Sequence, residues 1–160
     1  MGIKDEVAVL RCIPLFAHID PVKLKLLAFT SERIAFEPGQ TLFAQGAEAD
    51  AAYVIIDGRA EVLAETATGP VQLAVMERTA IVGEVAILCD VPRTATVRAL
   101  TKLDTLRIAK QQFLDLISEF PELAVEIMRT LALRLVRTNH ELTEAHSRLR
   151  TRDQGALDVF

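Results

Sequence analysis

Residues 32–109 consist of short apolar runs separated by turns that contain glycine, and no other feature of the chain restricts its fold as strongly. Short runs bounded by glycine and proline are typical of β-strands, and strands at such intervals predict an all-β sandwich or jelly-roll barrel. Asp57-Gly58 lies between two of the runs and predicts a hairpin, because both residue types tolerate a positive φ. The predicted strands are residues 33–36, 41–44, 53–56, 60–65, 71–76, 94–99 and 103–108.

Helical patterns flank this segment on both sides. Residues 4–12 are amphipathic, and Asp20-Pro21 is a favourable helix start, with aspartate as N-cap and proline at the first helical position. A short helix over 111–118 precedes a long one that begins at Pro121. The chain is thus predicted as one mainly β domain, a β-roll or jelly roll with flanking helices. Its parts are an N-terminal helical segment, the roll, a hinge with the long helix, and a tail, at residues 1–31, 32–109, 110–153 and 154–160.

The long helix carries an apolar heptad pattern. Met128, Leu135, Leu142 and Leu149 recur every seven residues, which is typical of a coiled-coil seam. The same stripe is also compatible with a helix that covers the roll. We expect packing on the roll up to about Leu135 and, beyond it, a parallel homodimer whose seam is interrupted by the polar Thr138.

Composition narrows the class of protein. The 160 residues are 51% hydrophobic and 25% charged, as in a soluble globular domain, and the net charge of -4 argues against nucleic acid as the main partner. No apolar run reaches the roughly 18 residues of a membrane span, and the first residues lack a secretion signal, so we expect a cytoplasmic protein. Cys12 and Cys89 predict two reduced, partly buried thiols, with a redox effect of Cys89 on ligand binding as the alternative.

Residues 81–99 hold the candidate site. Gly83 and Glu84 open a short apolar helical turn, whose first amides, at Val85 and Ala86, can bind an anion. Arg93 follows and offers a planar fork to two phosphate oxygens. An ionised carboxylate only accepts hydrogen bonds, so Glu84 suits a sugar hydroxyl. The pattern predicts a site for a small anion that also carries a hydroxyl.

Gly-Glu-Val-Ala-Ile-Leu followed by Pro-Arg-Thr-Ala-Thr resembles the phosphate-binding cassette of the cyclic nucleotide-binding domain family, whose members include catabolite activator proteins, protein kinase A regulatory subunits and nucleotide-gated channels. The resemblance implies that Glu84 binds the ribose 2'-hydroxyl and Arg93 the cyclic phosphate. It also implies that the remaining phosphate oxygens are bound by the amides of Val85 and Ala86, together with Thr94 and Ala95. The chain departs from the family at Thr79, which is often glycine, and at Val82, which is often aromatic. We expect Thr96 to be an ordinary strand residue.

The long helix extends the resemblance. Residues 131–140 are similar to the central helix of catabolite activator proteins, which carries a Thr-Ser pair that contacts adenine. Here the pair is Thr138-Asn139, which implies that Thr138 contacts the base in its own subunit and Asn139 the base in the partner. These contacts favour cAMP over cGMP as the ligand.

A metal enzyme of the cupin type is the rival interpretation of a jelly roll, because cupins mount several histidines on their strands. None of the three histidines, His18, His140 and His146, lies on a predicted strand, and no nucleophile set is recognisable, so we expect no catalytic residue, metal or cofactor. The function expected is a cyclic nucleotide sensor that signals to an unknown effector when its cassette moves the hinge and helix. Few residues follow the helix, so direct DNA binding is not expected. The alternatives are a nucleotide-independent dimerisation module and a regulatory fragment of a channel, kinase or transcription regulator.

Overall fold

The computed structural model describes residues 3–157, with side-chain environments for residues 6–153. The chain forms two compact units that divide after Leu123. The first unit holds the strands and all helices except most of the last one. These helices are α1 (Ile3–Cys12), the 3-10 turn η1 (Pro14–Phe16), α2 (Pro21–Thr30), α3 (Glu84–Cys89) and α4 (Lys110–Glu119). The second unit is the body of α5 (Pro121–Leu157).

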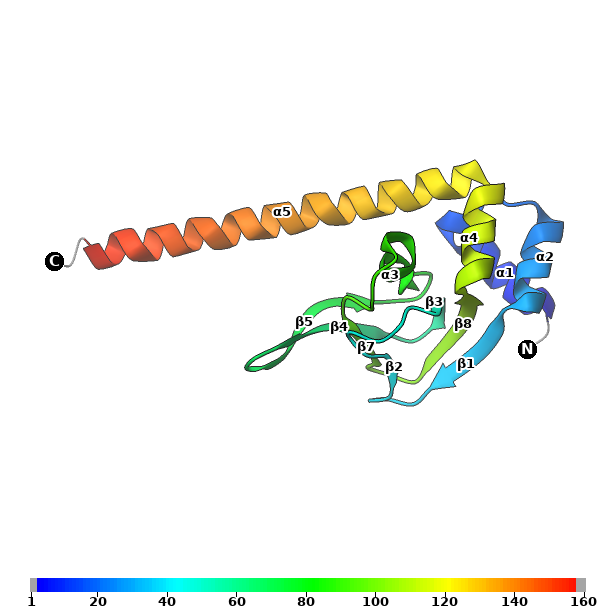
Figure 1. Cartoon of the computed structure of the whole chain (residues 1–160), viewed down its shortest axis with the longest axis horizontal. Helices are drawn as coiled ribbons and strands as arrows, with labels where there is room; N and C mark the ends of the chain where they lie inside the picture. The colour runs from blue at the N-terminus through cyan, green and yellow to red at the C-terminus, as the bar shows by residue number, and fades with distance from the viewer. Residues whose placement is uncertain (1–2, 158–160) are drawn as a thin grey trace. The chain divides into compact units, whose positions relative to one another are not determined.

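Within the described residues, eight strands form two antiparallel sheets of four strands each, in the orders β1-β8-β3-β6 and β2-β7-β4-β5 (Figure 1). The predicted β-roll is confirmed, and each of the seven expected strands agrees with an observed one to within two residues at both ends, whereas the two-residue strand β6 was not expected. The strands are β1 (Glu32–Phe36), β2 (Thr41–Phe43), β3 (Ala51–Asp57), β4 (Ala60–Thr66), β5 (Gly69–Met76), β6 (Ile81–Val82), β7 (Thr96–Ala99) and β8 (Leu103–Ala109).

The two sheets enclose an apolar core. Tyr53 and Ile55 of β3 pack there with Val97 of β7 and Leu103 of β8. β3 is buried along both faces from its first residue to Ile56, and helices α3 and α4 both contact this strand. Helices α1, α2 and α4 gather at the β1 and β8 end of the sheets (Figure 1). β3 therefore connects the interior of the roll to the helical layer.

The prediction of a hairpin at Asp57-Gly58 is wrong. β3 pairs with β6 and β8, whereas β4 pairs with β5 and β7, so this turn carries the chain from one sheet to the other. Gly58 has φ +93°, and a Cβ there would lie 2.2 Å from the carbonyl oxygen of Lys102. The local signal for a turn was correct, but the approach of the 101–103 segment, not a hairpin, requires the glycine.

Two further expectations need correction. β7 begins at Thr96, so Thr94 and Ala95 precede the strand that was predicted to contain them. Cys12 and Cys89 are exposed and not partly buried. Thr96 has the structural role that was expected, because its Oγ1 accepts a hydrogen bond from the backbone N–H of Gln45 at 2.9 Å.

The helix starts follow the sequence signals. Asp20 caps α2, with its Oδ1 accepting from the N–H of Val22 at 2.9 Å. The last helix, α5, begins at Pro121 and continues to Leu157, and residues 158–160 of the predicted tail lie outside the described residues. Its heptad residues Met128 and Leu135 are 59% and 61% exposed. No helix in the described part of the chain is long and apolar enough to cross a membrane.

Candidate functional site

The cassette starts at the edge of the β1-β8-β3-β6 sheet. Short strand β6 pairs with β3, with Val82 opposite Tyr53, and so delivers Gly83 next to the start of β3. Gly83 has φ +86°, and a Cβ on it would lie 2.6 Å from Nη1 of Arg93 and 3.3 Å from the carbonyl oxygen of Ala51. Any side chain here would press on Arg93, so glycine is required by both backbone conformation and space.

Helix α3 follows directly and is a single short segment with an apolar inner face. Glu84, its first residue, is 2% exposed, and Ala86 is 3% exposed, whereas Val85 is half-buried. The helix ends at Asp90, which adopts φ +53° and donates its backbone N–H to the carbonyls of Ala86 and Ile87. The structure thus keeps Glu84 and the predicted amide donors at the N-terminal end of one buried turn.

Arg93 joins the two halves of the cassette. Its side chain is 1% exposed. Nη1 donates to the carbonyl oxygen of Gly83 at 2.9 Å, and Nη2 donates to that of Ala51 at 2.6 Å. The guanidinium is therefore positioned by one backbone carbonyl of the cassette and one of β3.

The charge of Arg93 is incompletely compensated. Its one carboxylate contact in the described part of the chain is Asp50, at 3.4 Å from Nη2, and Asp50 is 65% exposed and also contacts Arg107 at 3.1 Å. Burial lowers the pKa of Arg93, with Asp50 acting in the opposite direction. Nε of Arg93 is buried and has no hydrogen-bond partner among these residues. A buried cation with an unsatisfied donor is an environment that favours an anionic ligand.

The segment around Arg93 is tied to the loop between β2 and β3. The N–H of Arg93 donates to the carbonyl oxygen of Ala47 at 2.8 Å, and its own carbonyl accepts from the N–H of Gly46 at 2.8 Å. Thr94 is exposed and Ala95 is 9% exposed. The structure places both residues immediately beyond this anchored point.

The other two predicted site residues lie on α5, in the second unit. Thr138 and Asn139 are exposed, and the carbonyl oxygen of Asn139 accepts a hydrogen bond from Oγ1 of Thr143 at 2.8 Å. The seven cassette residues thus lie together in the first unit, whereas Thr138 and Asn139 lie in the second.

Sequence reasoning missed three contributors to the site. Phe43 ends β2, and its ring centroid lies 4.0 Å from Cζ of Arg93. Asp50 and Ala51, at the start of β3, supply the carboxylate and carbonyl contacts already described. No local signal in the sequence marks these residues. Phe43 and Ala51 are residue types that are common in strands, and Asp50 is a type that is common in loops.

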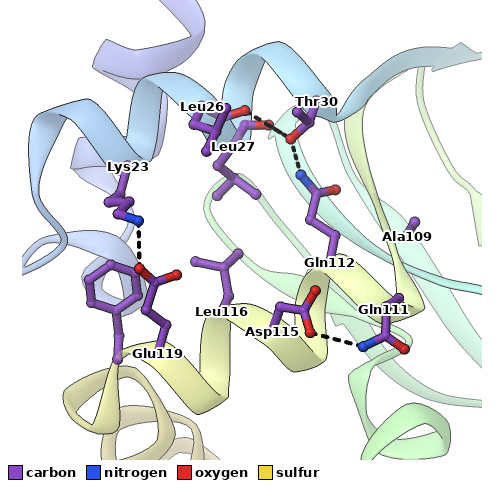
Figure 2. Close-up of a pocket in the computed structure, with 11 residues that line it drawn as sticks. Lys23, Leu26, Leu27, Thr30, Ala109, Gln111, Gln112, Asp115, Leu116 and Glu119 are labelled. Atoms are coloured by element: carbon purple, nitrogen blue, oxygen red, sulfur yellow. Dashed lines mark hydrogen bonds and ion pairs between the residues drawn. The ribbon is translucent and has the colours of Figure 1, made fainter.

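A separate pocket of about 550 Å³ lies between α2 and α4 (Figure 2). Leu26, Leu27 and Leu116 contribute apolar walls, and the Lys23–Glu119 ion pair borders one end. At the other end Gln112 donates to Thr30. The residues that line this pocket do not include the cassette, so it is distinct from the candidate site. In the described residues, no group of three or more His, Cys, Asp or Glu side chains is arranged to hold a metal ion.

The comparisons with known proteins show the family to which this chain belongs. Residues 33–120 match the family model of the cyclic nucleotide-binding domain, and this chain belongs to that family. A curated relative, the CRP-like cAMP-activated global transcriptional regulator of Mycobacterium tuberculosis, is 28% identical over 131 residues, which are 81% of this chain and 58% of the regulator. The cAMP-dependent protein kinase regulatory subunit of Aspergillus fumigatus is 32% identical over 106 residues, covering 66% of this chain and 25% of that subunit.

Solved structures show the same fold. The sensor domain of the transcriptional regulator DNR from Pseudomonas aeruginosa superposes with a TM-score of 0.75 at 25% identity, covering 83% of this chain and 90% of that domain. The catabolite activator protein of Thermus thermophilus gives a TM-score of 0.71 at 26% identity, covering 81% and 61% of the two chains. The chain spans less than two thirds of the length of the first curated relatives it matches.

Proposed function

We propose that this protein is a cyclic nucleotide sensor whose ligand is cAMP in preference to cGMP. The main support for the proposal is the environment of Arg93. Its buried guanidinium is hydrogen-bonded to the carbonyl oxygen of Gly83, and its Nε has no partner among the described residues. Family membership supports a cyclic nucleotide as the anion, and two relatives are described by name as cAMP-activated or cAMP-dependent.

Each cassette residue has a role in this proposal. Arg93 binds the cyclic phosphate, and Gly83 lets the backbone approach it closely. The amides of Val85 and Ala86 donate to phosphate oxygens, as free N–H groups at the start of a helical turn do. Glu84 accepts the ribose 2'-hydroxyl. Thr94 and Ala95 complete the phosphate contacts from the other half of the cassette.

The base is assigned to α5. Thr138 contacts adenine in its own subunit and Asn139 contacts the adenine bound by the partner, because an amide offers both a donor and an acceptor. This assignment requires a parallel homodimer through α5, which the exposed Met128, Leu135, Leu142 and Leu149 support.

Signalling is a shift between two positions of the cassette. Two contacts link the cassette region to the start of α4. Nζ of Lys110 lies 3.4 Å from Asp90, and the N–H of Lys110 donates to the carbonyl oxygen of Asp50 at 2.9 Å. A ligand switches the protein only if it binds one position more tightly than the other. Movement of the cassette would then be transmitted through α4 to α5 and to an effector protein.

The protein acts as a regulator and not as an enzyme in this proposal, and the two relatives described above are a transcriptional regulator and a kinase regulatory subunit by name. We place it in the cytoplasm, where exposed free cysteines such as Cys12 and Cys89 stay reduced. A second function, a dimerisation module that works without nucleotide, is supported by the same exposed α5 leucines.

Isothermal titration distinguishes the two functions. Protein stripped of carried ligand by unfolding and refolding is titrated with cAMP and then with cGMP. A sensor binds cAMP at micromolar concentration or tighter, and cGMP more weakly. Equal absence of binding for both nucleotides contradicts the sensor and favours the module.

Arg93→Ala tests the site itself. Loss of a charge-assisted contact to phosphate is worth about 2–4 kcal/mol, or about 30- to 900-fold in Kd. Arg98→Ala is the matched control, because this arginine on β7 pairs with Glu61 and not with the cassette. Circular dichroism must show that both variants are folded. Unchanged cAMP affinity in folded Arg93→Ala would refute the assignment of the cassette.

A further inference from the structure

Phe43 covers one face of the Arg93 guanidinium. Cζ of Arg93 lies 4.0 Å from the centroid of the ring. The ring also reaches the other half of the cassette, since its Cε1 would be 3.1 Å from a Cβ on Gly83. Phe43 is in turn supported by Tyr53, whose ring centroid is 6.0 Å away with a tilt of 32°. The last residue of β2 therefore contacts Arg93 and lies close to Gly83, the two residues that bracket the proposed phosphate position.

A buried guanidinium needs its orientation set in two ways. Its N–H donors lie in one plane, and within that plane the carbonyls of Gly83 and Ala51 accept from Nη1 and Nη2. Above the plane of the guanidinium, the negative face of the Phe43 ring attracts the positive charge of Arg93. This attraction is stronger when both groups are removed from water. The ring accepts no hydrogen bond from the in-plane N–H groups, so these donors stay available to oxygen atoms. A carboxylate at the same place would accept hydrogen bonds from some of them.

We propose that Phe43 is a positioning residue for the cyclic nucleotide, which holds the plane of the Arg93 guanidinium so that its remaining donors point at the phosphate. This inference rests on the proposed function. Two consequences follow. Phe43 contributes to affinity only for ligands that carry the phosphate, and an aromatic residue is required where an aliphatic one would fill similar space.

The competing explanation is that Phe43 is only a core residue, since it packs against the cluster around Tyr53 and Val97. The two explanations differ in what they predict for adenosine, which has the base and ribose but no phosphate. Damage to the core changes binding of cAMP and adenosine by the same factor. Loss of guanidinium orientation weakens binding of cAMP alone.

The test compares Phe43→Leu and Phe43→Tyr with the wild type by titration with cAMP and with adenosine. Phe43→Leu should weaken cAMP about tenfold and leave adenosine within about twofold, the scale of a desolvated cation–π contact. Phe43→Tyr keeps the aromatic face and should restore cAMP affinity to within about threefold. Equal weakening of both ligands, or no weakening in Phe43→Leu, would overturn the proposal.

A second readout does not depend on nucleotide. In ligand-free protein, NMR of the arginine side chains should show the Hε and Hη signals of Arg93 shifted upfield by the ring current, with slow exchange with water. Phe43→Leu should lose the shift and exchange faster, whereas Phe43→Tyr should keep both. Unshifted Arg93 signals in the wild type would refute the stacking even if cAMP binds. The proposed function can fail separately. This is the outcome if the wild type shows the upfield-shifted Arg93 signals but binds no nucleotide.

Discussion

Replacing Gly83 by alanine tests how the cassette is built. The added Cβ would lie 2.6 Å from Nη1 of Arg93, and it is also confined by the ring of Phe43 at 3.1 Å and the carbonyl oxygen of Ala51 at 3.3 Å. An exposed arginine could swing away from such a contact. Arg93 is 1% exposed and held by two backbone carbonyls, so it can move only by giving up these hydrogen bonds.

Two contributions determine how far Gly83→Ala lowers the free energy of unfolding. Alanine at a positive φ is destabilised by about 1–2 kcal/mol, of which about 0.4–1 kcal/mol is offset because alanine restricts the unfolded chain. Loss of the Nη1 hydrogen bond to Gly83 adds about 1.5–3 kcal/mol, the value for a hydrogen bond to a charged group. The expected decrease in the free energy of unfolding is therefore about 3 kcal/mol.

Gly46→Ala is the matched control. Gly46 has φ +84°, against +86° for Gly83, but nothing lies within 4 Å of its Cβ position. The alanine variant also keeps the N–H that donates to the carbonyl of Arg93. It should show only the backbone contribution, about 1 kcal/mol or less.

Urea unfolding followed by circular dichroism measures both variants. With an m-value of about 2 kcal/mol/M, the midpoint should fall by about 1.5 M in Gly83→Ala and by about 0.5 M or less in Gly46→Ala. Protein concentration is held constant, because a dimer would couple the midpoint to it. Equal shifts in the two variants would refute the claim that Arg93 is fixed against Gly83.

Two further predictions concern the roll. Thr79 adopts φ +74°, which is unfavourable for a β-branched residue, so Thr79→Gly should stabilise the protein by about 1 kcal/mol, and a thermal midpoint at or below that of the wild type would contradict this. Hydrogen bonds from Arg98 and Gln72 lower the pKa of Glu61 below its ordinary value of 4.5. The unfolded state therefore binds more protons, and the stability that Glu61 contributes is complete above pH 4.5 and lost as the pH falls through the folded pKa. The advantage of wild type over Glu61→Gln in urea unfolding should shrink below pH 4.5, and a difference independent of pH would contradict the assignment.

Local signals were sufficient to predict the helices and every strand except the two-residue β6, and to recognise the cassette motif. Glycine and proline punctuate strands wherever the chain must turn, and Gly83, Glu84 and Arg93 lie close enough in sequence to be recognised together. The Asp57-Gly58 signal shows where this reasoning stops. It indicated a turn correctly, but whether two strands pair is decided by which other strands compete for their edges, and β8 and β6 occupy the edges of β3.

The contacts of Arg93 with Phe43 and Ala51 were beyond local reasoning for a related reason. They join residues more than 40 positions apart, and two of the groups that hold the guanidinium are backbone carbonyls, which every residue possesses. Thr79 is the opposite case. The resemblance to the family already indicated a position that is often glycine, and its positive φ agrees with a turn in which glycine is the favoured residue.

The place of β8 in its sheet has a consequence for how the protein is made. β8 comes last in sequence but lies between β1 and β3, and the Arg33–Asp104 ion pair joins residues 71 positions apart. While the chain is being synthesised, β1 emerges from the ribosome long before the strand that it pairs with. Closing so long a loop is slow relative to local pairing. The roll must therefore assemble late, around its last strand, and until then β1 and β3 present unpaired edges to chaperones and to other nascent chains.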